Sequence, residues 1–407
     1  MKKLNNFKNY LLLAVLLVFG LASCRKDTNG KFAGKGAPVI SRIRTVSKSD
    51  TLPEATYTTY DSTGTASSVP AGYQVVTIAA FDSTTTTGRL SNLYAILGQN
   101  LGSTTKIVLN GVSIPFNRGL NSDNTVIFSI PQTLPTGPDQ TNKIVLTTLY
   151  GTVTYAFTVI SPPPTIIAVT DFDFYDGYTI KLLGTGFKTV TSVALTGSTA
   201  TPAIESISGD TVITLKMPST TLSRTNLIFT YGTGNTQTSP VEFVDLDNAY
   251  TIFYKNSFQN SWADGSWSGP SGVSTGASHS GTASAEATYP AGGWKIEGWA
   301  NWYPGIDKDS YKYLTFWVKG GTVTHTLILV GDKVAGGYSQ NTSAPAIQQI
   351  VVPPKVWTYF KIPLGTGGGQ LNYWATGNNA NQLGFFLQGQ SGDVDETYYF
   401  DEVAFVK

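Results

Sequence analysis

Short stretches of alternating apolar and polar residues, separated by turns rich in glycine, asparagine and aspartate, run along most of the chain. The segment 313–319 places Leu314, Phe316 and Val318 on one face and polar or amphipathic residues on the other. The segment 382–390 alternates in the same way, and we find no convincing helical period in the last third. The pattern therefore predicts an all-β protein built from sandwiches of short strands.

An internal repeat indicates that the first part of the chain contains two similar sandwiches. Residues 98–102 precede the sequence KIVLNG, and residues 184–187 precede SVALTG, at an offset of 86 residues (184 − 98 = 86). A strand before a proline follows in both copies at the same offset, and each copy ends with a Tyr-Gly turn. One strand-and-turn unit used twice predicts tandem immunoglobulin-like sandwiches.

Changes in composition suggest where the domains end. We expect a tether over 25–37, a first sandwich over 38–160 with a Thr/Ser-rich insertion at 47–88, a second over 161–245, and a last domain over 246–407. Three consecutive prolines after Ser161 favour a semi-rigid polyproline connection between the first two sandwiches.

The first 24 residues have the features of a targeting segment. Basic residues at Lys2, Lys3 and Lys8 precede an apolar run that is too short for a mature transmembrane helix, and the run ends in Leu-Ala-Ser-Cys. This matches the lipobox of bacterial lipoproteins, in which the cysteine is acylated. Cys24 is the only cysteine, so no disulfide framework exists. The alternative is a cleaved secretory peptide with an incidental cysteine.

Composition narrows the function classes. Only 13% of the 407 residues are charged and the net charge is +1, so no basic surface argues for nucleic acid. The 42 glycines, the many Thr and Ser residues, the 12% aromatic content and the near absence of methionine are typical of secreted all-β modules.

Aromatic residues concentrate in the last third. All eight tryptophans lie between Trp262 and Trp374, and three of them fall within residues 289–305, YPAGGWKIEGWANWYPG. Period-two spacing separates two faces there: one has Trp294, Ile296 and Gly298, and the other has Lys295, Glu297, Trp299 and Asn301. An indole among charged and amide groups suits a ligand with apolar faces and a polar rim, as a sugar ring has. The alternative is that these aromatics fill a core.

We therefore predict an exposed aromatic platform for saccharide rings. Its candidate members are Trp299 in first place, then Trp302 and Tyr303 in a turn, Trp374 and Trp267 in polar loops, and Glu297 and Gln388 as hydrogen-bonding partners. Trp317 and Trp357, which stand in regular apolar strands, are predicted to be packing residues.

The chain resembles known families at these motifs. The turn glycines, the middle strand before proline and the Tyr-Gly turn resemble the IPT/TIG immunoglobulin-like domain. The segments DSYKYLTFWVKGG, WTYFKIPLG and YYFDEVAFV resemble β-jelly-roll carbohydrate-binding modules. Their order after a lipobox looks like the surface glycan-binding proteins of Bacteroidetes polysaccharide-utilisation loci, most closely the xyloglucan-binding type.

That resemblance implies a polysaccharide ligand and an outer-membrane lipid anchor that faces the cell exterior. As partners it implies a TonB-dependent transporter with its lipoprotein partner, and surface glycoside hydrolases. It implies no cofactor, although a structural Ca²⁺ held by Asp401 with Asp393 or Asp395 is an option.

Two other functions stay open. An enzyme would need a recognisable nucleophile, a metal-ligand spacing or two facing carboxylates, and the sequence shows none of these patterns, although a lyase using Tyr and His would leave no motif. An adhesin or assembly protein could use the same anchor and direct its aromatics at a protein partner.

Overall fold

The structure is a computed structural model that describes residues 34–51, 56–60, 66–70, 76–80, 82–308 and 310–407. The predicted signal segment and Cys24 lie outside these residues. The described elements are 35 strands and four 3-10 helices, which confirms the all-β prediction. In this part of the chain no helix combines the length and the apolar character needed to cross a bilayer. Two compact units, 1–162 and 163–407, are described separately.

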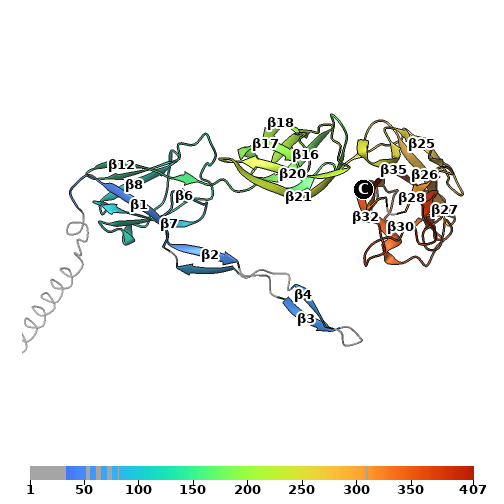
Figure 1. The fold of residues 1–407 in the computed structure, drawn as a ribbon, viewed down its shortest axis with the longest axis horizontal. Coiled ribbons are helices and arrows are strands. Elements are labelled where there is room, and N and C mark those ends of the chain that lie inside the picture. The colour runs from blue at the N-terminus through green and yellow to red at the C-terminus, as the bar shows by residue number, and fades with distance from the viewer. Residues whose placement is uncertain (1–33, 52–55, 61–65, 71–75, 81, 309) are drawn as a thin grey trace, which may run out of the picture. The chain divides into compact units, whose positions relative to one another are not determined.

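The first unit contains a two-layer sandwich, drawn in blue and green in Figure 1. One layer has the order β1 (Val39–Thr45), β7 (Leu93–Gln99), β10 (Thr125–Ser129). The other has the order β12 (Gly151–Ala156), β11 (Lys143–Thr148), β8 (Thr104–Leu109), β9 (Val112–Ser113). Apolar residues that alternate along both layers, such as Ile96 and Ile144, meet in one core.

Smaller elements complete this unit. Two strands pair in parallel, β6 (Thr87–Gly88) and β13 (Thr158–Val159), and a 3-10 helix, η1, spans Arg118–Leu120. The Thr/Ser-rich insertion forms two antiparallel ribbons: β2 (Ser47–Thr51) with β5 (Val76–Ala80), and β3 (Thr56–Tyr60) with β4 (Ala66–Pro70).

The second unit begins with a sandwich of the same strand pattern. One layer has the order β14 (Thr165–Val169), β16 (Thr179–Thr185), β19 (Val212–Lys216), β18 (Ala203–Ser208). The other has the order β15 (Asp173–Phe174), β21 (Asn235–Asp245), β20 (Arg224–Tyr231), β17 (Val190–Leu195). A 3-10 helix, η2 (Phe187–Thr189), follows β16.

Two glycines at the predicted 86-residue offset occupy equivalent positions in these sandwiches. Both Gly98 on β7 and Gly184 on β16 face a shift of register in the neighbouring strand. A Cβ atom added to either would lie 1.8 Å from a backbone carbonyl oxygen, that of Val39 or Thr165. The repeated glycine is therefore a requirement of close backbone approach at a β-bulge.

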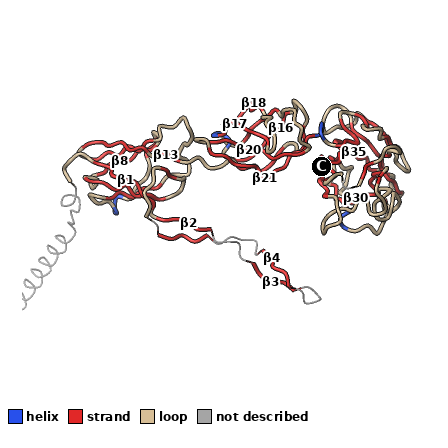
Figure 2. Tube along the Cα trace, viewed as in Figure 1, coloured by secondary structure: helices blue, strands red, loops and turns tan. Residues whose placement is uncertain are grey.

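The last sandwich follows η3 (Leu246–Asn248) without a long linker, and Figure 2 shows that strands and loops make up most of it. Its larger layer has seven strands: β23 (Ser257–Phe258), β22 (Tyr250–Tyr254), β35 (Glu396–Val406), β26 (Ser284–Tyr289), β25 (Ser271–Ser274), β29 (Tyr313–Lys319) and β32 (Trp357–Pro363). Its smaller layer has the order β24 (Ala263–Asp264), β27 (Trp294–Ala300), β34 (Gln382–Gln388), β30 (His325–Val330), β31 (Gln349–Val352).

Short elements close the ends of this sandwich. They are the pair β28 (Ile306–Asp307) and β33 (Asn379–Ala380), and the 3-10 helix η4 (Ala346–Gln348). Between the two layers lies the largest core of the described chain, in which Trp299 packs edge-on against Phe385 and Phe400.

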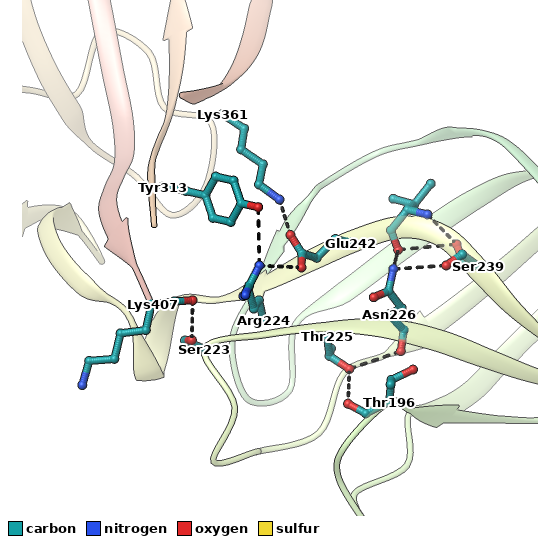
Figure 3. Close-up of polar contacts among 11 residues, drawn as sticks. Thr196, Ser223, Arg224, Thr225, Asn226, Ser239, Glu242, Tyr313, Lys361 and Lys407 are labelled. Carbon is teal, nitrogen blue, oxygen red and sulfur yellow. Dashed lines mark hydrogen bonds and ion pairs between the residues drawn. The ribbon is translucent and has the colours of Figure 1, made fainter. Parts of the chain in front are cut away.

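The second and last sandwiches share a packed junction. Val244, Leu246, Tyr254, Ala404 and Val406 form one apolar cluster that draws on both. Polar contacts flank it, as Figure 3 shows. Arg224 forms an ion pair with Glu242 at 3.2 Å and donates to the Tyr313 hydroxyl at 3.5 Å, Lys361 pairs with the same Glu242, and Ser223 donates to the Lys407 carbonyl.

Candidate functional site

The predicted exposure of Trp299 and Trp374 is wrong. Trp299 is fully buried, because its face of β27 is turned toward the seven-stranded layer. Trp374 is 5% exposed, donates from its indole nitrogen to the carbonyl of Ile306 at 2.9 Å and packs against Tyr373 and Phe405. The polar loop that carries Trp374 folds over the end of the sandwich and contributes to its core.

Glu297 is also buried, and it does not face solvent as predicted. It and Lys295 share the inward face of β27 with Trp299. Both polar groups have partners: the Ser266 hydroxyl donates to Glu297 at 2.9 Å, and Lys295 donates to the carbonyls of Ser268 and Gly269 at 2.7 and 3.1 Å. The predicted alternation of β27 is thus correct, but the inward and outward faces are exchanged.

The outward face of the five-stranded layer has an apolar floor. Ile296 on β27 lies opposite Phe386 on β34, which lies opposite Ile328 on β30. Trp294 is half-buried; it precedes Ile296 by two residues on β27 and lies directly opposite Gln388. Because paired residues of antiparallel strands point to the same side, these side chains form one surface.

Trp267 extends this floor at the edge of the layer. Its backbone exchanges hydrogen bonds with Ile296 at 2.9 and 3.0 Å, so its side chain points outward with that of Ile296. The indole packs edge-on against Tyr338 at 5.1 Å and is 44% exposed. Tyr338 lies against Gly298 and Gly384, where a side chain of any other residue would collide with it.

A cleft of about 460 Å³ opens on the same face. Its apolar base includes Ile328 and Phe386, and its polar groups come from Thr326, Gln349 and Gln388, among others. His325 also borders the cleft, but it pairs with Val352 of the core and its Nε2 atom is buried. None of the cleft-lining residues is an aspartate or a glutamate. The cleft can therefore offer hydrogen bonds to hydroxyl groups, but it lacks the paired carboxylates of a glycosidase.

Of the other predicted platform residues, Gln388 lines the cleft, whereas Trp302 and Tyr303 do not. Trp302 and Tyr303 follow the last residue of β27 and are 72% and 87% exposed. Gln388 is exposed as predicted, and its amide donates to the carbonyl of Gly293 at 3.2 Å. Of the seven predicted residues, Trp267, Trp302, Tyr303 and Gln388 are thus accessible to a ligand.

The carboxylates suggested for calcium are engaged elsewhere. Asp401 accepts backbone hydrogen bonds from His279, Ser280 and Glu402, while Asp393 and Asp395 accept backbone bonds from Gln390 and Ala291. Neither Asp393 nor Asp395 belongs to the group of three potential metal ligands found among the described residues.

That group of three is Asp171, His279 and Glu402, at the junction of the second and last sandwiches. The imidazole lies between the two carboxylates, with Nε2 3.2 Å from Asp171 and Nδ1 3.2 Å from Glu402. A metal ion is bound by one nitrogen of an imidazole, whereas here both nitrogens face a carboxylate. The geometry is that of an ion-paired imidazolium.

Sequence reasoning missed Trp294 and Gln349 as members of the outward face of this layer. One signal was present, because the alternation of 382–390 already placed Phe386 and Gln388 on a face of their own, opposite apolar residues that enter the core. The missing information was the pairing of β34 with β27, which puts Trp294 beside Gln388.

Comparisons with known proteins agree with this fold. No family model matches the chain. An IPT/TIG domain-containing protein of Bacteroides ovatus is 30% identical over 129 residues, which make up 31% of this chain and 26% of that relative. The match thus spans about a quarter of the relative, and its description agrees with the immunoglobulin-like resemblance of the repeats.

Solved structures are similar over most of the chain. The surface glycan-binding protein PbSGBP-B from Prevotella bryantii superposes with a TM-score of 0.54 at 17% identity, covering 92% of this chain and 99% of that one. SGBP-B from a complex xyloglucan utilization locus in Bacteroides uniformis gives a TM-score of 0.40 at 15% identity, covering 78% and 96%. The first of these confirms the predicted all-β fold.

Proposed function

We propose that this protein binds polysaccharide without cleaving it, through the outward face of the five-stranded layer. The observation that carries the proposal is the combination of Trp267 and Trp294 with an apolar floor and a cleft rimmed by amide and hydroxyl groups. A sugar ring has apolar faces and a polar rim, so it can stack on indoles while its hydroxyls pair at the rim.

The fold shared with PbSGBP-B, a surface glycan-binding protein, supports the same function. A plant β-glycan is our proposed ligand class, with xyloglucan favoured by the sequence resemblance. The lack of carboxylates in the cleft supports binding over hydrolysis.

Affinity electrophoresis of the full chain tests this proposal. The gels contain xyloglucan, mixed-linkage glucan, mannan or xylan, and we expect retardation in at least one. Trp267→Ala and Trp294→Ala should each weaken binding roughly 10-fold or more, since an indole that loses about 100 Å² of exposed surface contributes about 2–3 kcal/mol. Retention of full affinity by both variants, or release of reducing sugar, would contradict the proposal.

Trp302 and Tyr303 are proposed as a second contact for a long chain, outside the cleft. Trp302→Ala in the same gels shows whether the ligand reaches them. An effect on polymer but not on short oligosaccharides is expected, because only a long ligand can span from the cleft to the loop at the far end of β27.

The proposal includes attachment to the outer membrane through acylated Cys24, with presentation at the cell surface. A surface lipoprotein of this kind would deliver captured glycan to a TonB-dependent transporter, its lipoprotein partner and surface hydrolases. Cys24→Ser should abolish metabolic labelling with a fatty acid and release the protein from the membrane fraction. Surface labelling of intact cells checks which side of the membrane it faces.

A further inference from the structure

The loop that carries Trp267 is fastened to β27 from the inside of the sandwich. Residues 263–270 run along the edge of the five-stranded layer, with Ala263 and Asp264 paired to Ala300 and Trp299. Along this segment the side chains alternate: Trp267 points outward, whereas Ser266 turns inward to Glu297.

Four hydrogen bonds fix the inward side of this segment, from Ser266 to Gly269. The Ser266 hydroxyl donates to Glu297 at 2.9 Å and accepts from the backbone nitrogen of Gly298 at 3.1 Å. Two residues later, the carbonyls of Ser268 and Gly269 both accept from Lys295. These two residues have φ angles of 67° and 72°, so the chain makes a left-handed turn around the ammonium group.

Lys295 and Glu297 also lie close enough for each charge to favour the charged form of the other. Both are almost fully buried, which is costly for charged groups unless partners satisfy them. Burial raises the pKa of Glu297 to about 8 and lowers that of Lys295. An apolar side chain would fill the same space at a lower cost in desolvation free energy. The charged groups therefore indicate that this position serves to fix the conformation of the loop.

We propose that Lys295, Glu297 and Ser266 are positioning residues that hold Trp267 over the outward face and thereby set the affinity of the binding surface. They act through the loop and do not touch the ligand. The predicted effect on affinity rests on the proposed function. The anchoring of the loop does not, and it can be measured without a ligand.

A double-mutant cycle with soluble xyloglucan tests the consequence. Ser266→Ala should weaken binding about threefold to tenfold, the effect of one lost hydrogen bond. In a Trp267→Ala background the same change should have almost no further effect, since the side chain that it positions is gone. An equal loss in both backgrounds would overturn the proposal.

Glu297→Gln, which keeps an uncharged acceptor of the same shape, should bind like the wild type, whereas Glu297→Leu should not.

Hydrogen exchange without ligand tests the anchoring. The amides of Gly265 and Trp267 donate to the carbonyls of Gly298 and Ile296. They should exchange faster in Ser266→Ala and Lys295→Met, while strands of the larger layer stay protected. Unchanged exchange would overturn the anchoring even if the variants bind weakly. Faster exchange in a protein that binds no polysaccharide would instead keep the anchoring and reject the proposed function.

Discussion

The imidazole of His279 joins the last sandwich to Asp171 of the second sandwich, with 3.2 Å between Nε2 and the carboxylate. Its Nδ1 lies at the same distance from Glu402 on β35, and its ring stacks on Trp317 at 3.8 Å. Nδ1 is hydrogen-bonded to Glu402, while Nε2 is within ion-pair distance of Asp171, so the charges of both carboxylates favour the imidazolium. The junction therefore has a buried ion pair at its centre, and its strength should depend on pH.

We expect stability to fall as the pH rises through neutrality. Burial alone would lower the pKa of His279, but the hydrogen bond and charge of Glu402 and the charge of Asp171 raise it above its ordinary value. The stabilisation is then complete below about pH 6.5 and is lost as the pH rises through the folded pKa. Burial also raises the pKa of Asp171 to about 6 and of Asp401 to about 7, which acts in the same direction.

Thermal unfolding of the full chain between pH 5 and 9 measures this dependence. His279→Gln should flatten the profile above about pH 6.5, where the imidazole titrates. A wild-type melting temperature that is constant or rises over this range would contradict the assignment of an imidazolium.

At a fixed pH of 6, we expect His279→Gln to cost about 3–5 kcal/mol, because it leaves the buried carboxylates of Asp171 and Glu402 without their partner. The matched control is Lys255→Met, which removes the ion pair with Asp247. That pair is partly exposed, so its loss should cost about 1 kcal/mol or less. Denaturant unfolding compares the two, and similar losses would show that the junction contributes no more than a surface contact.

Gly184→Ala should destabilise the second sandwich strongly, since the new methyl group would lie 1.8 Å from the carbonyl oxygen of Thr165. Gly98→Ala should do the same in the first sandwich. Gly368 has open space around its Cβ position and is the control. We expect losses of more than about 3 kcal/mol for the first two changes and about 0.5 kcal/mol or less for Gly368→Ala. Equal effects at all three positions would reject the structural equivalence of the repeated glycines.

The sequence was sufficient for the features that depend on local alternation. The strand pattern at 313–319 correctly placed Leu314, Phe316 and Val318 on one face, which enters the core, and the pattern at 382–390 correctly separated two faces of its strand. The 86-residue offset also predicted that Gly98 and Gly184 are equivalent. Where two backbones approach closely only glycine fits, so the repeated glycine is visible in the sequence itself.

The site was harder to predict because alternation separates two faces without telling which one is inside. On β27 the charges of Lys295 and Glu297 suggested that their face is exposed and that the face with Ile296 is the inner one. The structure shows the reverse for Lys295 and Glu297, which are buried. The inward charges are paired with groups of a segment about 30 residues earlier in the chain, a contact that no local pattern reveals. Trp317 shows a related effect: its outward face of β29 is covered by the second sandwich, whose Phe172 lies 6.4 Å from the indole, and the indole also meets His279 and Tyr359 of its own sandwich.

Selective oxidation of tryptophan separates the accessible indoles from the buried ones. With limiting N-bromosuccinimide and peptide mapping, Trp302 should react first and Trp267 next, in the order of their exposure, 72% and 44%. Trp262, Trp299, Trp317 and Trp374 should stay intact until the protein unfolds, because their indoles are 7% exposed or less.

Adding the polysaccharide turns this experiment into a map of the bound ligand. If the glycan lies on the outward face of the five-stranded layer, it covers Trp267 and Trp294 together, because both border the floor formed by Ile296 and Phe386. Oxidation of Trp267 should then slow several-fold, while a short oligosaccharide should leave the rate at Trp302 unchanged. Protection of Trp302 alone would move the binding surface to the loop after β27. Since the cleft would then be bypassed, that result would reject the proposed site but leave the fold assignment intact.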